Sequence, residues 1–380
     1  MRVVATISAI LWLTACTSSG TVGESDAGTD VSEDAVGDIG SVDTFVQPTF
    51  PDLPKGWSVI ETGGETICSR GSKYLFLVRK GTVNRIVIDF MGGGACWNEQ
   101  TCSFADSIFN ENLDLFENAG GDVDLDGIYD SSDQANPFKD WYHVVVPYCT
   151  GDIHWGNSVV DYGADAGTIH HKGAVNTQAV LDWVGDQFSA PEKIFVTGCS
   201  AGAYGSIGWA PHIIEQFPTA KITQMGDSGV GVITQNFFED SFPKWNAWDI
   251  IPDWIDALNL SEADFFELGL EDVYIEVAAH YPDLTFSQFT TAFDKTQVIY
   301  FQAMGGGSAQ DWSDQVMLSI HKAKKNSPNF RAYIAPGDQH CVIPYANFYT
   351  MESAGTVLSD WVTDMVNDEP VEHVQCDPCD

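Results

Sequence analysis

The chain has 380 residues, with 54 acidic and 17 basic side chains and a formal net charge of −37 at pH 7. This charge excludes binding to nucleic acid through its phosphates, because such binding needs clustered lysine and arginine. It also repels polyanionic partners at low ionic strength.

The first 16 residues have the form of an export signal. Arg2 precedes a mostly apolar run at 3–13 and the ending Leu13-Thr14-Ala15-Cys16, and the run is too short to span a bilayer. The ending resembles a bacterial lipobox, in which Cys16 becomes the lipidated first residue. We therefore expect a lipoprotein of the cell envelope, on the outer membrane or its periplasmic or surface face, that meets the membrane only through this lipid anchor. An ordinary cleaved signal with a chance cysteine is the alternative.

Residues 17–50 are expected to form an acidic, disordered tether. They are rich in Ser, Thr, Gly, Asp and Glu and contain no Lys or Arg. Their acidic side chains therefore repel one another, and the segment offers little that could form a core. The rest of the chain, 51–380, suits one large catalytic domain.

Apolar, β-branched runs alternate with helical patterns through this domain. The expected strands are 74–78, 85–90, 142–147, 193–197, 220–225, 297–302 and 330–335. The expected helices are 173–188, 203–217 and 310–325. Several strands are almost continuously apolar, which is typical of strands buried on both faces. The alternation predicts an α/β fold with a mostly parallel sheet and helices on both faces.

Residues 233–293 depart from this alternation. They are rich in aromatic side chains and show no clear buried strand. We interpret them as a helical cap inserted over the edge of the sheet. Ordinary surface helices would have a similar composition.

Two glycine-rich loops follow predicted strands. Gly198-Cys199-Ser200-Ala201-Gly202 follows the strand 193–197, and G-x-S-x-G in this context is typical of a nucleophile elbow, which exposes a serine at a sharp strand-to-helix turn. Gly92-Gly93-Gly94 follows the strand 85–90, where backbone N–H groups can approach a developing oxyanion. A phosphate-binding loop is disfavoured because no G-K-[ST] follows.

Nine histidines compete for the role of general base. His340 is placed best, because it follows the last predicted strand and α/β-hydrolases carry serine, acid and histidine in that order. A structural loop histidine is the alternative.

The order of five motifs resembles the pectin acetylesterase/Notum family of carboxylesterases. They are Phe90-Met91-Gly92-Gly93-Gly94-Ala95-Cys96-Trp97-Asn98, Tyr148-Cys149-Thr150-Gly151-Asp152-Ile153-His154, Gly198-Cys199-Ser200-Ala201-Gly202, Gly226-Asp227-Ser228-Gly229 and Gly337-x-x-His340. The resemblance spans about 55–365 and implies an α/β-hydrolase fold, a Ser-His-Asp triad and no cofactor for catalysis. It implies Ser200 as nucleophile and His340 as base. It assigns the oxyanion hole to the backbone N–H groups of Gly93, Gly94 and Ala201.

The acid of the triad has competing assignments. The family usually carries it after the strand equivalent to 297–302 and several residues before a glutamine. If Gln310 is that glutamine, a glycine occupies the acid position and Asp311 is the nearest carboxylate. We therefore name Asp311, with Asp227 as the rival. A triad without a proper acid is the third alternative and would keep less activity, because the acid fixes the histidine tautomer and stabilises the imidazolium.

The segment 122–133 has the spacing of a calcium loop, with glycine at the sixth position. The ligands would be Asp122, Asp124, Asp126, the carbonyl of Ile128, Asp130 and Asp133. An acidic loop in an acidic chain is the alternative. If calcium binds, we expect it to have a structural role.

Eight cysteines remain beside Cys16. An even number in an exported protein predicts disulfides. We expect Cys376 and Cys379 to close a terminal disulfide rather than half a zinc site, because no second pair has that spacing.

Together these patterns predict an exported, monomeric serine carboxylesterase that removes acetyl or other small acyl groups from polysaccharides or related esters. Trp97, Tyr148 and Trp155 are expected to line the substrate pocket, with packing under the loops as the alternative. The net charge favours neutral acetylated glycans or small esters over a dense polygalacturonate. A hydrolase-fold surface protein that binds glycans with little or no catalysis is the rival function.

Overall fold

A computed structural model of the chain describes residues 49–104, 107–113 and 126–379. The signal segment, Cys16 and nearly all of the tether therefore lie outside the described residues. Among the residues described, no helix combines the length and the apolar character needed to cross a bilayer.

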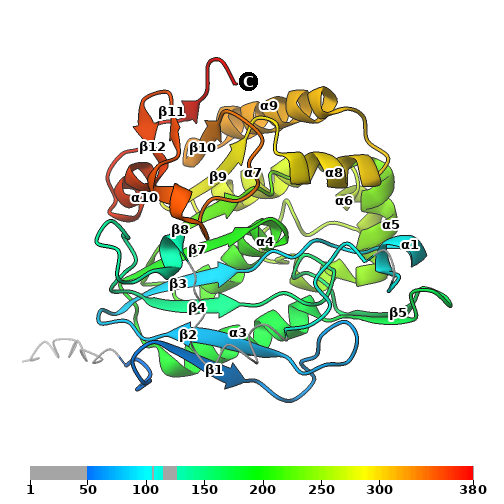
Figure 1. The fold of residues 1–380 in the computed structure, drawn as a ribbon, viewed down its shortest axis with the longest axis horizontal. Helices are drawn as coiled ribbons and strands as arrows, with labels where there is room; N and C mark the ends of the chain where they lie inside the picture. Colours follow the sequence, from blue (N-terminus) through cyan, green and yellow to red (C-terminus); the bar gives the residue numbers. More distant parts are fainter. Residues whose placement is uncertain (1–48, 105–106, 114–125, 380) are drawn as a thin grey trace, which may run out of the picture. The chain divides into compact units, whose positions relative to one another are not determined.

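A nine-stranded sheet organises the described part of the chain (Figure 1). Its strands are β1 Trp57–Glu61, β2 Leu75–Arg79, β3 Arg85–Phe90, β4 Tyr142–Val146, β7 Lys193–Cys199, β8 Lys221–Asp227, β9 Thr285–Thr291, β10 Phe330–Ala335 and β13 Val374–Gln375. The spatial order is β1-β2-β4-β3-β7-β8-β9-β10-β13. Only β2 runs against its neighbours, and every adjacent pair from β4 to β13 is parallel. The predicted mostly parallel sheet is confirmed.

Helices and short turns fill the connections. The α-helices are α1 Glu99–Cys102, α3 Gly173–Gln187, α4 Ala201–Gln216, α5 Gln235–Trp245, α6 Glu262–Phe265, α7 Leu270–His280, α8 Lys295–Ala303, α9 Ala309–Asn326 and α10 Leu358–Val366. The 3-10 helices are η1 Gly127–Tyr129, η2 Ala247–Ile250 and η3 Ala346–Tyr349. Two small hairpins complete the set, β5 Ser158–Asp161 with β6 Thr168–His171 and β11 Glu352–Ser353 with β12 Thr356–Val357.

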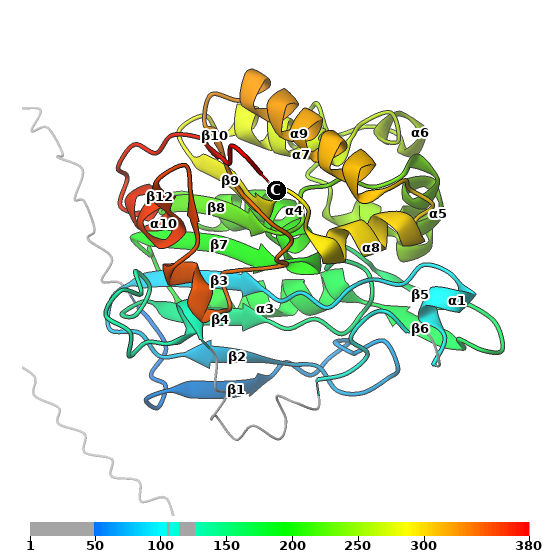
Figure 2. The same cartoon turned by 45° about the horizontal axis from the view of Figure 1, so that its top comes forward.

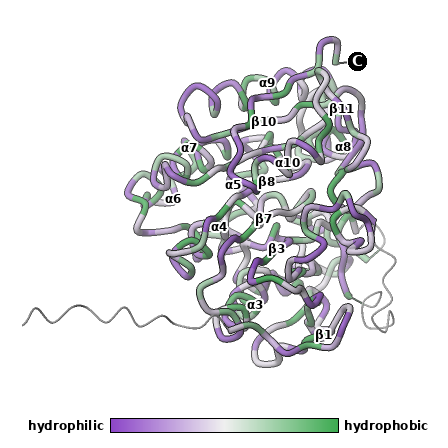
Figure 3. Tube along the Cα trace, turned by 90° about the vertical axis from the view of Figure 1, so that its left-hand side faces the viewer, coloured by the Kyte–Doolittle hydropathy of each residue, from purple (hydrophilic) through white to green (hydrophobic). Residues whose placement is uncertain are grey.

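The two faces of the sheet are covered unequally. One face buries side chains such as Ile88 and Val196 against α3, α4, α7 and α9. The other buries Val87 and Phe195 against α10, η1 and η3, and Figure 2 shows α10 and α3 on opposite sides of the sheet. Hydrophobic and hydrophilic residues alternate along α9 in Figure 3, as expected for a helix that buries one side. The predicted helices on both faces are confirmed, although the second layer is thin.

One predicted strand is wrong, and three strands of the central sheet were missed, namely β1, β9 and β13. The segment 297–302 lies inside helix α8, which Asp294 caps by accepting hydrogen bonds from the N–H groups of Thr296 and Gln297. Of these, β9 lies within the expected cap, so the end of the segment 233–293 belongs to the central sheet and not to a helical insertion. The sequence of β9 is TFSQFTT, and its buried polar side chains hide it from a search for apolar runs.

Among the described cysteines, all eight pair into disulfides, as predicted. The pairs are Cys68–Cys149, Cys96–Cys102, Cys199–Cys341 and Cys376–Cys379. The last pair closes the terminal clamp that the C-x-x-C spacing indicated.

Candidate active site

The loops that follow β3, β7, β9 and β10 meet at the carboxyl edge of the sheet. They carry Gly92–Gly94, Ser200, Asp294 and His340 respectively. In Figure 1 the arrowheads of β3 and β7 point toward this edge, on the side where α5 and α8 lie. Parallel neighbouring strands bring these loops together, since their carboxyl ends share one edge.

The turn at Ser200 has the geometry of a nucleophile elbow. Ser200 has φ 58° and ψ −121°, a conformation that is strained for a residue with a Cβ. A Cβ on Gly202 would lie 1.8 Å from the carbonyl oxygen of Phe90, and one on Gly198 would lie 2.3 Å from the carbonyl oxygen of Gly202. Both flanking glycines are therefore needed for β3, β7 and α4 to approach each other this closely.

His340 is paired with Asp294. Its Nδ1 lies 3.0 and 2.9 Å from the two carboxylate oxygens of Asp294. The Asp294 side chain is fully buried, whereas that of His340 is 18% exposed. Because Nδ1 faces a carboxylate, Nε2 is the ring nitrogen left to act as a base. His340 and Ser200 line the same open cleft of about 590 Å³.

The prediction that Asp311 orients this histidine is wrong. The Asp311 carboxylate accepts hydrogen bonds of 2.7 Å from the backbone N–H and the hydroxyl of Ser308, in a capping box at the start of α9. Asp294 was missed because the strand before it was not recognised. Its position three residues after β9 is the signal that a correct strand assignment would have supplied.

Asp227, the rival acid, supports the loop that carries His340. Its Oδ2 accepts hydrogen bonds from the N–H groups of Val342 and Ile343, at 2.8 and 2.9 Å. Burial raises the pKa of this carboxyl to about 6. The Cys199–Cys341 disulfide joins the residue before Ser200 to the residue after His340. These contacts hold the two loops together, while Asp294 alone of the two aspartates bonds the imidazole.

The glycine loop after β3 is packed too tightly for larger residues. A Cβ on Gly94, which has φ 78°, would lie 2.0 Å from the carbonyl oxygen of Ile108. The predicted oxyanion donors Gly93, Gly94 and Ala201 border the cavities around Ser200: the open cleft is lined by both glycines, and an apolar pocket by Gly94 and Ala201.

His154 is a supporting residue to which the sequence reading gave no role. Its Nε2 donates to the carbonyl oxygen of Met91 at 2.9 Å, directly before the glycine loop. Burial lowers the pKa of His154 to about 4, so its ring is neutral. Both Ile153 and His154 have positive φ, and the buried carboxylate of Asp152 accepts from the His154 N–H. The sequence signal for this role was the position of His154 at the end of the motif 148–154.

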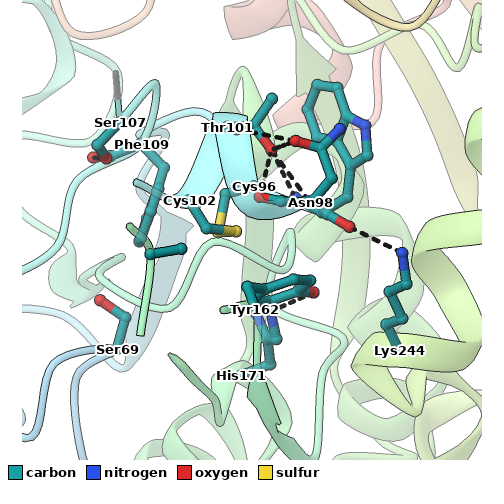
Figure 4. Close-up of a disulfide and its surroundings, with 12 residues drawn as sticks. Ser69, Cys96, Asn98, Thr101, Cys102, Ser107, Phe109, Tyr162, His171 and Lys244 are labelled. Carbon is teal, nitrogen blue, oxygen red and sulfur yellow. Dashed lines mark hydrogen bonds between the residues drawn. A yellow bond between two sulfur atoms is a disulfide. The ribbon is translucent and has the colours of Figure 1, made fainter. Parts of the chain in front are cut away.

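A second disulfide shapes the segment after the glycine loop (Figure 4). Cys96–Cys102 closes a short loop around the start of α1. Helix α5 is bound to this loop, because Trp245 Nε1 donates to the Cys96 carbonyl at 3.0 Å and Lys244 Nζ to the Trp97 carbonyl at 3.2 Å. Helix α5, at the start of the segment expected to form a cap, is therefore attached to the loop that continues from the glycines.

The three aromatic residues expected in the substrate pocket lie beneath it. Trp97, Tyr148 and Trp155 are all buried. Trp97 packs on Phe237, and Trp155 donates to the Tyr204 carbonyl. They support the loops by packing and do not line either cavity at Ser200. Other aromatic residues, Tyr300 and Tyr345, line the open cleft instead.

The calcium loop is described only in part. Asp122 and Asp124 lie outside the described residues. Of the other predicted ligands, Asp126 lines the cleft beside Ser200, and the Ile128 carbonyl accepts from Asn136 Nδ2 at 2.9 Å. Asp130 and Asp133 accept from donors in their own turns. Calcium binding stays a prediction.

The chain matches one family model and is similar in fold to a solved structure. A family model described as Pectinacetylesterase matches residues 58–246. The chain is also similar to the solved structure of the Wnt deacylase Notum from Drosophila, with a TM-score of 0.63 and 14% identity over 84% of this chain and 96% of that one. No curated protein matches the chain. The structural likeness shows the fold, which is that of an α/β-hydrolase.

The buried carboxyl of Asp152 should make stability depend on pH. Burial raises its pKa to about 6 from an ordinary value near 3.8, so the folded state binds more protons than the unfolded state between these values. The stabilisation is then present below pH 4 and lost as pH rises through 6. This carboxyl alone should lower the free energy of unfolding by about 2 kcal/mol between pH 4.5 and pH 7.5.

Urea unfolding of the wild type and Asp152→Asn at both pH values measures this contribution. Buried histidines such as His154 contribute with the opposite sign, so the difference between the two proteins is the relevant quantity. An identical pH dependence in both proteins would contradict the assignment.

Proposed function

The chain belongs to the pectinacetylesterase family across residues 58–246, and on this premise we propose that it is a serine carboxylic-ester hydrolase that removes acetyl or other small acyl groups. The observation that carries the proposal is the buried Asp294 bonded to His340, in the cleft that Ser200 also lines. Catalysis by these groups needs no cofactor.

Acylation begins at Ser200. Its hydroxyl attacks the ester carbonyl while His340 Nε2 takes the proton. Asp294 keeps the proton of the neutral ring on Nδ1 and stabilises the imidazolium that forms. The N–H groups of Gly93, Gly94 and Ala201 donate to the oxyanion, which is where preorganised donors lower a barrier most.

Deacylation repeats these roles with water. His340 first gives its proton to the leaving alkoxide, which departs as the alcohol and leaves an acyl-Ser200 ester. It then takes a proton from water, whose oxygen attacks the acyl carbonyl. Return of that proton to Ser200 releases the carboxylic acid and regenerates the enzyme.

A glycan-binding protein without catalysis is less well supported. That alternative drew its support from the missing acid in the sequence. Asp294 occupies the required position after β9, and burial of an aspartate against a histidine has a direct use in catalysis.

The alcohol part of the substrate is proposed to be a neutral glycan. The open cleft carries the carboxylates of Asp89 and Asp126, and its lining within the described part of the chain contains no Lys or Arg. Two like unit charges 4 Å apart in water repel by about 1 kcal/mol. An acetylated polygalacturonate is therefore disfavoured relative to an uncharged acetylated polysaccharide.

Export and lipid anchoring at Cys16 remain part of the proposal, as do a monomeric state and structural calcium. The four disulfides fit an oxidising compartment.

Replacing Ser200 by alanine tests the activity itself. The wild type should hydrolyse p-nitrophenyl acetate, and Ser200→Ala should lose about 10⁶-fold in kcat because the nucleophile is gone. Liberation of p-nitrophenol by equal amounts of the two purified proteins gives the comparison. Equal rates would contradict the proposed function.

Two aspartate variants test the identity of the acid. Asp294→Asn should lower kcat by about 10⁴-fold, because the amide no longer fixes the tautomer or stabilises the imidazolium. Asp311→Asn is the matched control and should keep wild-type kcat with a slightly lower melting temperature. The assignment fails if only the Asp311 variant loses activity.

Acetylated polymers with and without charge test the preference of the cleft for a neutral glycan. Acetate should be released faster from acetylated xylan than from acetylated polygalacturonate at low salt. Methyl esterification of the same polygalacturonate, or added salt, should reduce the difference in acetate release between the two polymers. Both changes weaken the repulsion between the polymer's carboxylates and those of the cleft. Equal release from both polymers with no salt dependence would contradict a charge-selective cleft.

A further inference from the structure

Ser200 separates two cavities of different character. The open cleft of about 590 Å³ lies toward His340. A pocket of about 50 Å³, also bordered by Ser200 and Gly94, has an apolar lining that includes Ala95, Ile153 and Phe237. Because it is apolar and adjoins the predicted oxyanion donors Gly94 and Ala201, this pocket suits the acyl part of an ester.

The volume of the pocket limits what can enter. One water-sized site needs about 10–15 Å³, so 50 Å³ holds roughly four such sites. This is room for an acyl chain of about two to four carbons. A longer chain would have to displace packed side chains, which is costly in a close-packed interior.

A second, larger cavity shares lining residues with this pocket. It has a volume of about 320 Å³ and is bordered by α7 and α9. Ile233 and Leu270 line both cavities, so we take these two residues as the partition between them.

The partition is held in place by its surroundings. Leu270 is buried at the start of α7, and its Cβ lies so close to Gly231 that a Cβ there would approach to 2.8 Å. The first turn of α7 is fixed because Asp272 accepts from the Gly269 N–H and pairs with Lys322 of α9. Leu270 therefore cannot move aside without shifting the start of a helix.

We propose that Leu270, together with Ile233, sets the acyl-chain limit of the enzyme and restricts it to short acyl groups. This inference rests on the proposed ester hydrolysis. Truncation of Leu270 joins the acyl pocket to the larger cavity, where the side chains of Val232, Phe238 and Leu318 can contact a longer chain.

The test measures kcat/KM for p-nitrophenyl acetate, butyrate and octanoate. In the wild type, octanoate should be at least about tenfold poorer than butyrate, since unaccommodated methylenes lower transition-state binding. Leu270→Ala should raise the octanoate-to-acetate ratio by about tenfold or more. Leu318→Ala is the matched control, because Leu318 is 69% exposed and lines the larger cavity but not the pocket beside Ser200. The octanoate-to-acetate ratio of this variant should equal that of the wild type.

Ile233→Ala provides a second opening of the same partition if Leu270→Ala does not fold, and it should shift the ratio in the same direction. A wild type that cleaves octanoate as well as acetate would overturn the chain-length limit, as would folded Leu270→Ala and Ile233→Ala variants with unchanged ratios. In both cases ester hydrolysis itself would stand. A wild type no faster than Ser200→Ala on every ester would overturn both proposals.

Discussion

The pairing of His340 with Asp294 is the contact on which the active site depends. Asp294 stands after β9, His340 after β10 and Ser200 after β7, so only the parallel order of these strands brings the three together. The buried carboxylate accepts hydrogen bonds from the N-terminus of α8 as well as from the imidazole. A helix N-terminus favours negative charge, so the start of α8 holds the Asp294 carboxylate in place for the role that the proposed mechanism gives it.

Covalent and close-packed constraints hold the remaining groups around this pair. The Cys199–Cys341 disulfide ties the serine loop to the histidine loop, and the backbone of the serine turn is strained. Strain of this kind persists only where the surroundings over-determine the conformation. On the other side, His154 fixes the peptide before the glycine loop, and α5 is bonded to the segment after it. The same α5 supplies Phe237 to the apolar pocket beside Ser200, so α5 and the glycine loop form one supported unit.

The sequence predicted the groups whose signals are local. The elbow and the glycine loop follow apolar strands, and close backbone packing requires their glycines. The acid could not be found this way, because β9 buries Ser, Gln and Thr side chains and resembles a polar loop. The apolar segment 297–302 of α8 was predicted as a strand in its place. The roles of Trp97 and Trp155 depend on which side of a loop is buried, and the order of residues along the chain does not contain that information.

The hydrogen bond between His340 and Asp294 can be observed directly by proton NMR. An imidazole Nδ1–H bonded to a buried carboxylate gives a strongly downfield, exchange-protected resonance. The account predicts this resonance in the wild type and in Asp311→Asn, and its loss in His340→Ala and Asp294→Asn. A resonance that survives in a folded Asp294→Asn protein but disappears in Asp311→Asn or Asp227→Asn would contradict the proposed catalytic unit.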